Sequence, residues 1–147
     1  MTKCSTHPTV TRRSPCALAN GLEILGDRWT LLIIRDLMFT NRREFRHFLA
    51  AGEGISTNIL TDRLQRLQCA GVISKRPHPD HGKKFVYELT GVGRALAPTV
   101  IEFGLWAVRS IDGSLLPPVL LDMMENQRDE LIEKVARGDC LLELDLG

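Results

Sequence analysis

The sequence has no apolar run long enough to span a membrane and no apolar segment of the kind that forms a secretory signal. A membrane-spanning helix needs ~20 apolar residues in a row, and a signal sequence needs an apolar core behind a basic start. The first thirteen residues are instead polar and include His7, Pro8, Arg12 and Arg13. We therefore expect a cytoplasmic protein without a membrane-bound part.

The motifs of common enzyme classes are also missing. The sequence contains no Gly-rich phosphate loop, no nucleophile elbow and no pair of carboxylates in a glycine-bounded segment. Phosphoryl transfer, ester hydrolysis and acid–base catalysis commonly rely on these patterns. We therefore predict that the chain is not an enzyme and uses no cofactor.

A strong net charge is absent as well, since the formal net charge of the 147 residues is only +1. This average conceals a split. Residues 1–111 carry 16 Lys and Arg against 9 Asp and Glu, whereas residues 112–147 carry 3 against 9. A basic body can bind a polyanion through one face even when an acidic segment neutralises the total. The charge pattern therefore keeps nucleic acid among the candidate partners.

The composition is that of an ordinary globular protein, with 44% apolar and 25% charged residues. The length suits one domain with extensions. We predict a flexible arm over residues 1–13, a folded domain over 14–111 and an acidic, helical extension over 112–147. With no export signal, the four cysteines are expected to be free thiols.

Apolar periodicity, caps and breakers predict the order helix, helix, short helix, helix, hairpin, helix. The helices are expected at about 16–25, 29–37, 45–50, 57–70, 91–111 and 119–136, and the strands at 72–76 and 85–89. Pro98 predicts a kink or a broken start in the helix over 91–111. Three helices followed by a two-stranded hairpin are typical of a winged helix, so we predict a mainly α (α+β) winged helix-turn-helix.

In such a fold the second helix of the helix-turn-helix enters the major groove. Leu60, Leu64 and Leu67 mark the buried side of the helix over 57–70. Its outward side carries hydrogen-bonding groups that we predict to contact DNA: Ser56, Thr57, Asn58, Thr61, Asp62, Gln65 and Arg66. Asn and Gln can pair with adenine, and Asp can accept from cytosine. A merely solvated helix face would look similar, so this face alone does not decide the function.

The predicted hairpin, or wing, is rich in cationic groups at and beside its tip. We predict that these residues contact the DNA backbone, together with three arginines at the start of the helix-turn-helix: Arg42, Arg43, Arg46, Lys75, Arg76, His78, His81, Lys83 and Lys84. Residues 28–84 hold 11 Lys and Arg against 5 Asp and Glu. The positive excess thus coincides with the predicted DNA-binding elements, and binding should weaken steeply with salt.

Short motifs in this order and spacing resemble the HxlR-type branch of winged-helix regulators, which is related to MarR-like regulators. The matching segments span about residues 14–111: Cys16-Ala17-Leu18, Ile24-Leu25-Gly26-Asp27-Arg28-Trp29-Thr30-Leu31-Leu32-Ile33, Arg43-Glu44-Phe45, Gly54-Ile55-Ser56, Leu60-Thr61-Asp62-Arg63-Leu64, Leu67, Gly71-Val72-Ile73, Tyr87-Glu88-Leu89-Thr90 and Gly93. The resemblance implies a homodimer in which the N-terminal helix and the last core helix serve as flanking dimerisation helices. It also implies a palindromic operator whose half-sites lie ~34 Å apart or a multiple of it.

The resemblance also implies a sensor role for Cys16. Many members of the family carry a cysteine near the start of the first helix, and in several it is a switch for oxidants, quinones or aldehydes. The positive end of the helix dipole, with Arg12 and Arg13 near in sequence, would favour the reactive thiolate. Cys4 is the candidate resolving thiol, whereas Cys69 is expected to be buried and inert. The alternative is that Cys16 only packs at the dimer interface.

Two sequence pairs have the spacing of metal ligands. Cys4-x-x-His7 and His78-x-x-His81 would each need further ligands, and neither has a second cysteine pair nearby. His78 and His81 fit the wing better, so we predict no metal site.

We therefore predict a sequence-specific regulator of transcription, acting as a repressor that binds double-stranded DNA as a homodimer. Two alternatives stay open. The first is a winged-helix protein-interaction module that does not bind DNA, which the acidic extension would favour. The second is a regulator with a small-molecule effector site at the dimer interface, near Trp29, Phe103 and Trp106, although core packing also explains these residues.

Overall fold

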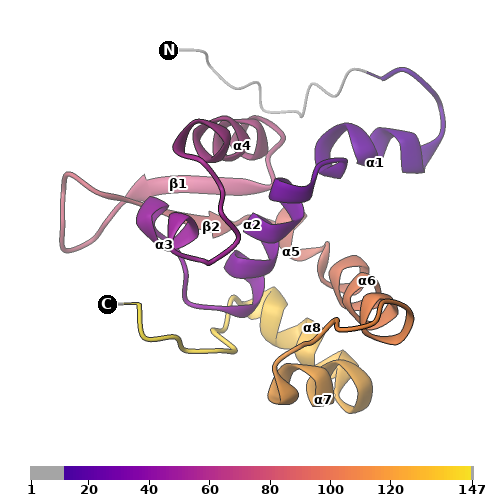
Figure 1. Cartoon of the computed structure of the whole chain (residues 1–147). Coiled ribbons are helices and arrows are strands. Elements are labelled where there is room, and N and C mark those ends of the chain that lie inside the picture. Colours follow the sequence, from indigo (N-terminus) through magenta and orange to yellow (C-terminus); the bar gives the residue numbers. More distant parts are fainter. Residues whose placement is uncertain (1–11, 147) are drawn as a thin grey trace.

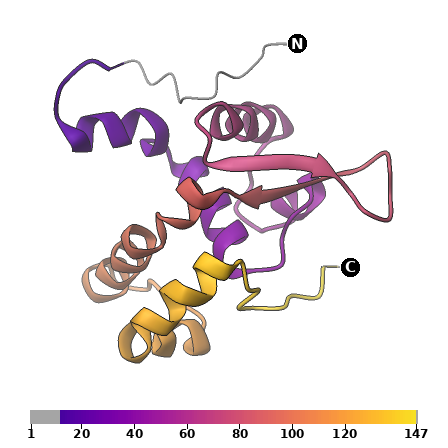
Figure 2. The same cartoon turned by 180° about the vertical axis from the view of Figure 1, so that it is seen from behind.

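Within residues 12–146, which are those that the structure describes, the computed structural model forms eight helices and one two-stranded antiparallel sheet (Figures 1 and 2). In chain order the elements are α1 (Ala17–Leu25), α2 (Arg28–Phe39), α3 (Phe45–Leu49), α4 (Thr57–Cys69), β1 (Ile73–Pro77), β2 (Phe85–Leu89), α5 (Gly91–Arg94), α6 (Ala97–Ser110), α7 (Pro118–Asn126) and α8 (Arg128–Arg137). The predicted mainly α winged helix with a two-stranded hairpin is confirmed. Across these residues every helix is too short or too polar to traverse a lipid bilayer.

Helix α2 is the centre of the fold. The Asp27 carboxylate caps its N-terminus by accepting hydrogen bonds from the backbone N–H groups of Trp29 and Thr30, both at 3.1 Å. These are donors that the helix itself leaves unpaired. α2 packs against α1, α4, α6 and β2, and Ile34 in its middle is fully buried. The central position agrees with a sequence that is apolar almost all round the helix.

Helix α4 is the second helix of the helix-turn-helix, after α3. Its residues Leu60, Leu64 and Leu67 are buried, and the helix packs on α2, α3 and β1. It ends at Gly71, whose φ is +70°, and the N–H of Val72 donates to the carbonyl of Leu67 at 3.0 Å. This Schellman ending favours glycine, because a side chain is strained at positive φ. The ending turns the chain directly from α4 into β1.

The hairpin joins the end of α4 to the start of α5. Its register places Ile73 opposite Leu89 in an antiparallel pair. The Thr90 hydroxyl donates to the carbonyl of Gly71 at 2.5 Å and also accepts from the backbone N–H of Gly93 at 3.2 Å. One side chain therefore fixes the base of the hairpin to the end of α4 and caps α5.

Two segments predicted as single helices are each divided into two. The segment over 91–111 forms α5 and α6, and Pro98 lies in the first turn of α6, where its missing N–H is tolerated. The predicted broken start is thus confirmed. The prediction of one helix over 119–136 was wrong, because Gln127 leaves the helical conformation and separates α7 from α8. The apolar pattern continues across the break because both helices bury side chains in the same core.

The acidic extension folds back onto the rest of the molecule. Both views place α7 and α8 at the end of the molecule opposite α1 and α4 (Figures 1 and 2), where they pack on α5 and α6. The chain after α8 runs along the end of α2: the N–H of Leu142 donates to the carbonyl of Phe39 at 3.0 Å, and the Asn41 amide exchanges two hydrogen bonds of 3.0 Å with the backbone of Leu144. The extension therefore leaves the outward face of α4 open.

Candidate nucleic-acid interface

The predicted base-contacting residues lie together on the outward face of α4. The Ser56 hydroxyl caps the helix by accepting from the N–H of Ile59 at 3.3 Å. All seven predicted residues are exposed: Ser56, Thr57, Asn58, Thr61, Asp62, Gln65 and Arg66. Because the leucines of α4 point into the core, its polar face is available to a partner.

Arg63, which sequence reasoning missed, fixes the position of α4. Its Nε donates to a carboxylate oxygen of Asp27 at 2.8 Å, and its Nη1 pairs with Asp62. Partial burial alone would raise the pKa of Asp27, but hydrogen bonds from Thr30 and Arg63 outweigh it and hold the pKa below its usual value. Asp27 therefore caps α2 and anchors α4 at the same time. The pair joins residues 36 positions apart, a separation that local spacing cannot reveal.

The wing presents its cations around a short tip that extends away from the helices (Figure 1). The N–H of His78 donates to the carbonyl of Lys84 at 2.9 Å and closes the turn. The His78 and His81 rings lie 4.9 Å apart between their centroids. Lys83 is exposed and forms no ion pair with any residue in the described part of the chain. The tip thus offers positive charge to solvent.

Two carboxylates partly neutralise the wing. Arg76 forms a bidentate pair with Glu88, with N–O distances of 3.2 and 2.6 Å. Glu44 lies 3.7 Å from the Lys84 ammonium and 3.8 Å from the His78 imidazole. The Arg76 and Lys84 side chains are 51% and 46% exposed, and an ion pair of an exposed cation contributes at most about 1 kcal/mol. DNA phosphates can therefore compete for these cations.

Two of the three arginines predicted at the start of the helix-turn-helix point inward instead of to solvent. The Asp36 carboxylate is 4% exposed, and it pairs with Arg35 at 2.9 Å and with Arg42 at 3.3 Å. Arg43 donates from Nη1 to two backbone carbonyls of its own loop, both at 2.8 Å. Only Arg46 is exposed. The physical reason is that the buried Asp36 carboxylate and the loop carbonyls are shielded from water. They therefore need hydrogen-bond donors from the protein itself.

A second surface of the molecule is apolar. Helix α1 buries none of its residues, and the side chains of Leu18 and Leu22 are 81% and 63% exposed. On α6, the rings of Phe103 and Trp106 stack at 5.9 Å and both are more than half exposed. Trp29 is half-buried and packs against the core. Exposed apolar side chains on α1 and α6 mark candidate interaction surfaces.

The cysteines occupy different environments. Cys16 is an exposed free thiol at the N-cap of α1, and Arg13 pairs with Glu23 at 3.2 Å. Cys69 is half-buried at the end of α4 and is disulfide-bonded, so the expectation of a buried free thiol was wrong. The last position of a helix lies beside a turn, where a side chain near the apolar stripe is not enclosed. Cys4 lies outside the described residues, as does most of the arm predicted over 1–13.

The structure describes only one of the two pairs with metal-ligand spacing. His78 and His81 stand at the wing, whereas Cys4 and His7 lie outside the described residues. Across residues 12–146, no three His, Cys, Asp or Glu side chains gather closely enough to hold a metal ion.

Comparisons with known proteins agree with this geometry. A family model described as "HxlR-like helix-turn-helix" matches residues 24–115. The chain is 36% identical over 96 residues to the uncharacterized HTH-type transcriptional regulator YvaP of Bacillus subtilis (strain 168), which covers 65% of this chain and 88% of that protein. The family and this relative are regulators of transcription rather than enzymes, as predicted.

Two solved structures share the architecture. The first is PA1607, described as a candidate transcription factor, with a TM-score of 0.66, 32% identity, and coverage of 73% of this chain and 75% of that one. The second is the reduced form of the transcriptional regulator YodB from B. subtilis, with a TM-score of 0.56, 27% identity, and coverage of 67% and 97%.

Proposed function

Because the chain belongs to the HxlR-like helix-turn-helix family of transcriptional regulators, we propose that it represses transcription in the cytoplasm by binding a palindromic operator as a homodimer. The observation that carries the proposal is the exposed polar face of α4 beside a hairpin with a cationic tip. In this geometry α4 enters the major groove and the wing follows the DNA backbone.

Three side chains on α4 would supply the base contacts. Asn58 and Gln65 can each pair bidentately with adenine, and Asp62 can accept from the cytosine amine. Thr57 lies in the first helical turn, where its hydroxyl and the free N–H groups suit a phosphate. Arg63, by holding Asp62 and Asp27 together, would fix the angle at which α4 enters the groove.

The exposed cations would supply the backbone contacts. The wing contributes Lys75, Arg76, His78, His81, Lys83 and Lys84, and the helices contribute Arg46 and Arg66. Arg42 and Arg43 belong to this set only indirectly, because their guanidinium groups hold the loop between α2 and α3. We therefore assign them a structural role in the interface.

A second copy of this chain is the proposed occupant of the apolar surface formed by Leu18, Leu22, Phe103 and Trp106. A palindromic operator requires two copies of α4 related by a two-fold axis. The helices α1 and α6 lie away from the hairpin tip (Figures 1 and 2), so pairing through them would leave both wings free.

The dimer is tested by Leu22→Asp, with Val92→Asp as the control because Val92 is equally exposed on α5, outside this surface. Sedimentation should show a monomer for Leu22→Asp and a dimer for the control, with operator affinity at least ~100-fold lower for the monomer. If Leu22→Asp remains a dimer like the control, the proposed dimer surface is refuted.

Cys16 is the proposed site of a response to oxidants or electrophiles. The support is its position as an exposed, free thiol beside Leu18 on the proposed dimer surface, where a modified sulfur would disturb the pairing of α1. Oxidant should release DNA from the wild type but not from Cys16→Ser. Equal release from both would exclude this thiol.

The function itself is tested by selection from random duplexes. We expect an enriched palindrome, and its loss in Lys83→Ala/Lys84→Ala at moderate salt. The competing proposal is a protein-interaction module, favoured by the acidic extension. Absence of any enriched sequence at low salt would favour that module.

A further inference from the structure

A small cavity lies between the base of the wing and the acidic extension. Its volume is about 50 Å³, which is more than one water molecule needs (about 10–15 Å³) and far below the ~300 Å³ of a drug-sized ligand site. Leu37 and Leu89 form its apolar wall, and the exposed residues Gly138 and Asp139 stand at its rim. Only a few waters or one small ligand group can enter.

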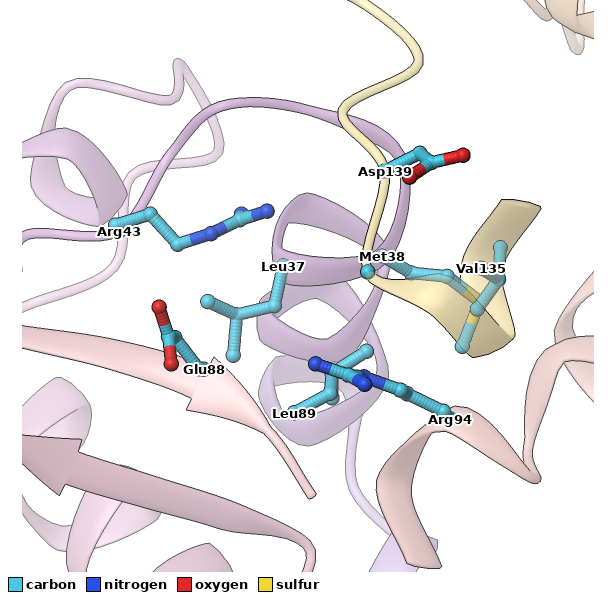
Figure 3. A pocket seen from close by; sticks show the side chains of 9 residues that line it. Leu37, Met38, Arg43, Glu88, Leu89, Arg94, Val135 and Asp139 are labelled. Carbon is cyan, nitrogen blue, oxygen red and sulfur yellow. The ribbon is translucent and has the colours of Figure 1, made fainter. Parts of the chain in front are cut away.

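Two guanidinium groups point into this cavity from opposite sides, one from Arg43 and one from Arg94 (Figure 3). Arg43 uses Nη1 for two loop carbonyls, and Arg94 uses Nη1 for the carbonyl of Ala136 at 3.2 Å. Neither arginine forms an ion pair with any residue between 12 and 146. Glu88 interacts electrostatically with both guanidinium groups without an ion-pair contact, so each brings a partly compensated positive charge and further N–H donors to the cavity.

The two acidic residues of the lining offset these charges only in part, because each already has another arginine as its ion-pair partner. Glu88 is held by the bidentate pair with Arg76, and Asp139 is held by Arg137 at 3.0 and 3.1 Å. Arg76 and Arg137 lie outside the lining. Together, these four guanidinium groups and two carboxylates leave a net charge of +2 at the cavity.

Burial makes the excess positive charge at the cavity energetically costly. The pKa of Arg43 lies below its usual value because burial disfavours the cation, although a guanidinium stays protonated at neutral pH. A charged group removed from water without a counter-ion is unfavourable. A bound anion would supply that counter-ion through charge-assisted hydrogen bonds.

The extension completes the cavity. Arg43, Glu88 and Arg94 lie within the segment that matches the family model, whereas Val135, Gly138 and Asp139 lie beyond its end at residue 115. The close approach of α8 is specific, since a Cβ added at Gly138 would lie 2.9 Å from Nη2 of Arg94. The site is therefore a property of this chain rather than of the matched segment alone.

We propose that this cavity binds a small oxyanion, either inorganic phosphate or sulfate or a short carboxylate, between the guanidinium groups of Arg43 and Arg94. The anion would tie the extension to the loop between α2 and α3. That loop is bonded to the wing, because the N–H of Tyr87 donates to the carbonyl of Arg43 at 2.8 Å.

The test is a titration of the full chain followed by amide NMR, with phosphate, sulfate, acetate and chloride at constant ionic strength. We expect saturable shifts at Arg94, Gly138 and Asp139 with at least one oxyanion, and none with chloride. Comparison of the phosphate and sulfate titrations with the acetate titration distinguishes a phosphate-like ligand from a carboxylate. Linear shifts with every salt would overturn the proposal.

Arg94→Gln should weaken the saturable binding at least tenfold. The control is Arg128→Gln, which removes the same charge from an exposed ion pair with Glu102 at the N-terminal end of α8 and should bind like the wild type. Equal weakening by both variants would show a general charge effect and contradict the site. If Arg94→Gln fails to fold, the wild-type titration alone still decides.

Discussion

The wing and the junction between α2 and α3 are both rich in basic residues, yet only the wing exposes its basic side chains to solvent. We call Arg35, Arg42 and Arg43 the junction cluster and Lys75, Arg76, Lys83 and Lys84 the wing cluster. The junction cluster surrounds a buried carboxylate and turned-in carbonyls, whereas the cations of the wing cluster stay exposed even where they pair with Glu44 or Glu88. The difference teaches that acidic partners and burial, rather than the number of cations, decide which cluster can bind DNA.

Removal of the carboxylate that organises the junction cluster should have the largest effect. Asp36→Ala leaves the partly buried Arg42 without a carboxylate partner and Arg35 with Glu53 alone, so we expect the free energy of unfolding to fall by about 3 kcal/mol. Urea denaturation measures it. Asp112→Asn, at an exposed position, is the control and should change stability by less than about 0.5 kcal/mol. Similar values for the two variants would remove the structural role of the cluster.

Gln65→Ala tests the base contacts that we propose for α4. Loss of a bidentate base contact should cost about 1–3 kcal/mol of operator affinity and relax the preference at one base pair. The wing should be unaffected, so affinity for unrelated duplexes should stay the same. A uniform loss on every duplex would instead place Gln65 at the backbone.

Glu44 pairs with Lys84 of the wing cluster. Its removal should make the positive charge of the wing more available to DNA. Burial alone would raise its pKa, but Arg46, His47 and Lys84 hold the pKa below its usual value. Glu44→Gln keeps the side-chain oxygen at the cap of α3 but releases the wing cations, so we expect duplex affinity to rise by at most about fivefold. Fluorescence anisotropy measures it, and a fall in affinity would show that Glu44 orients the wing instead.

The smallest effect is expected from pH. Burial lowers the pKa of His47, and its Nδ1 accepts from the N–H groups of Arg43 and Glu44, both at 3.2 Å. The unfolded chain therefore binds this proton more readily, so stability is present above a pH of about 6.5 and is lost as the pH falls through that value toward the lowered pKa. His47→Asn should flatten the loss seen by denaturation between pH 7.5 and 5.5. Parallel curves would assign the loss to other groups.

Much of the fold follows from local sequence signals. Pro98 acts at the position predicted for it, and the capping roles of Asp27 and Thr90 and the helix stop at Gly71 are equally local, because caps, stops and breakers work within a few residues. The outward direction of the polar face of α4 follows equally from the spacing of its leucines. The split at Gln127 could not be predicted, because the apolar pattern continues on both sides of it.

The pairing of charges could not be predicted, since it depends on contacts between distant segments. Arg42 and Arg46 look alike in the sequence, but the fold places Arg42 against the buried Asp36, whereas Arg46 is exposed and pairs with Glu44. Likewise the link from Arg63 to Asp27, and the approach of α8 to Arg94, arise only when the chain has folded. Charge counts therefore pointed to the half of the chain that we propose to bind DNA but not to the individual ion pairs.

The salt dependence of duplex binding tests the contrast between the clusters most directly. Each phosphate contact contributes about 0.9 to the slope of log affinity against log salt concentration. We predict that Lys83→Ala/Lys84→Ala lowers the slope by about 2 for each wing, while Arg42→Gln leaves the slope unchanged and lowers only the stability. An unchanged slope in the wing variant, with a reduced slope for Arg42→Gln, would contradict the account.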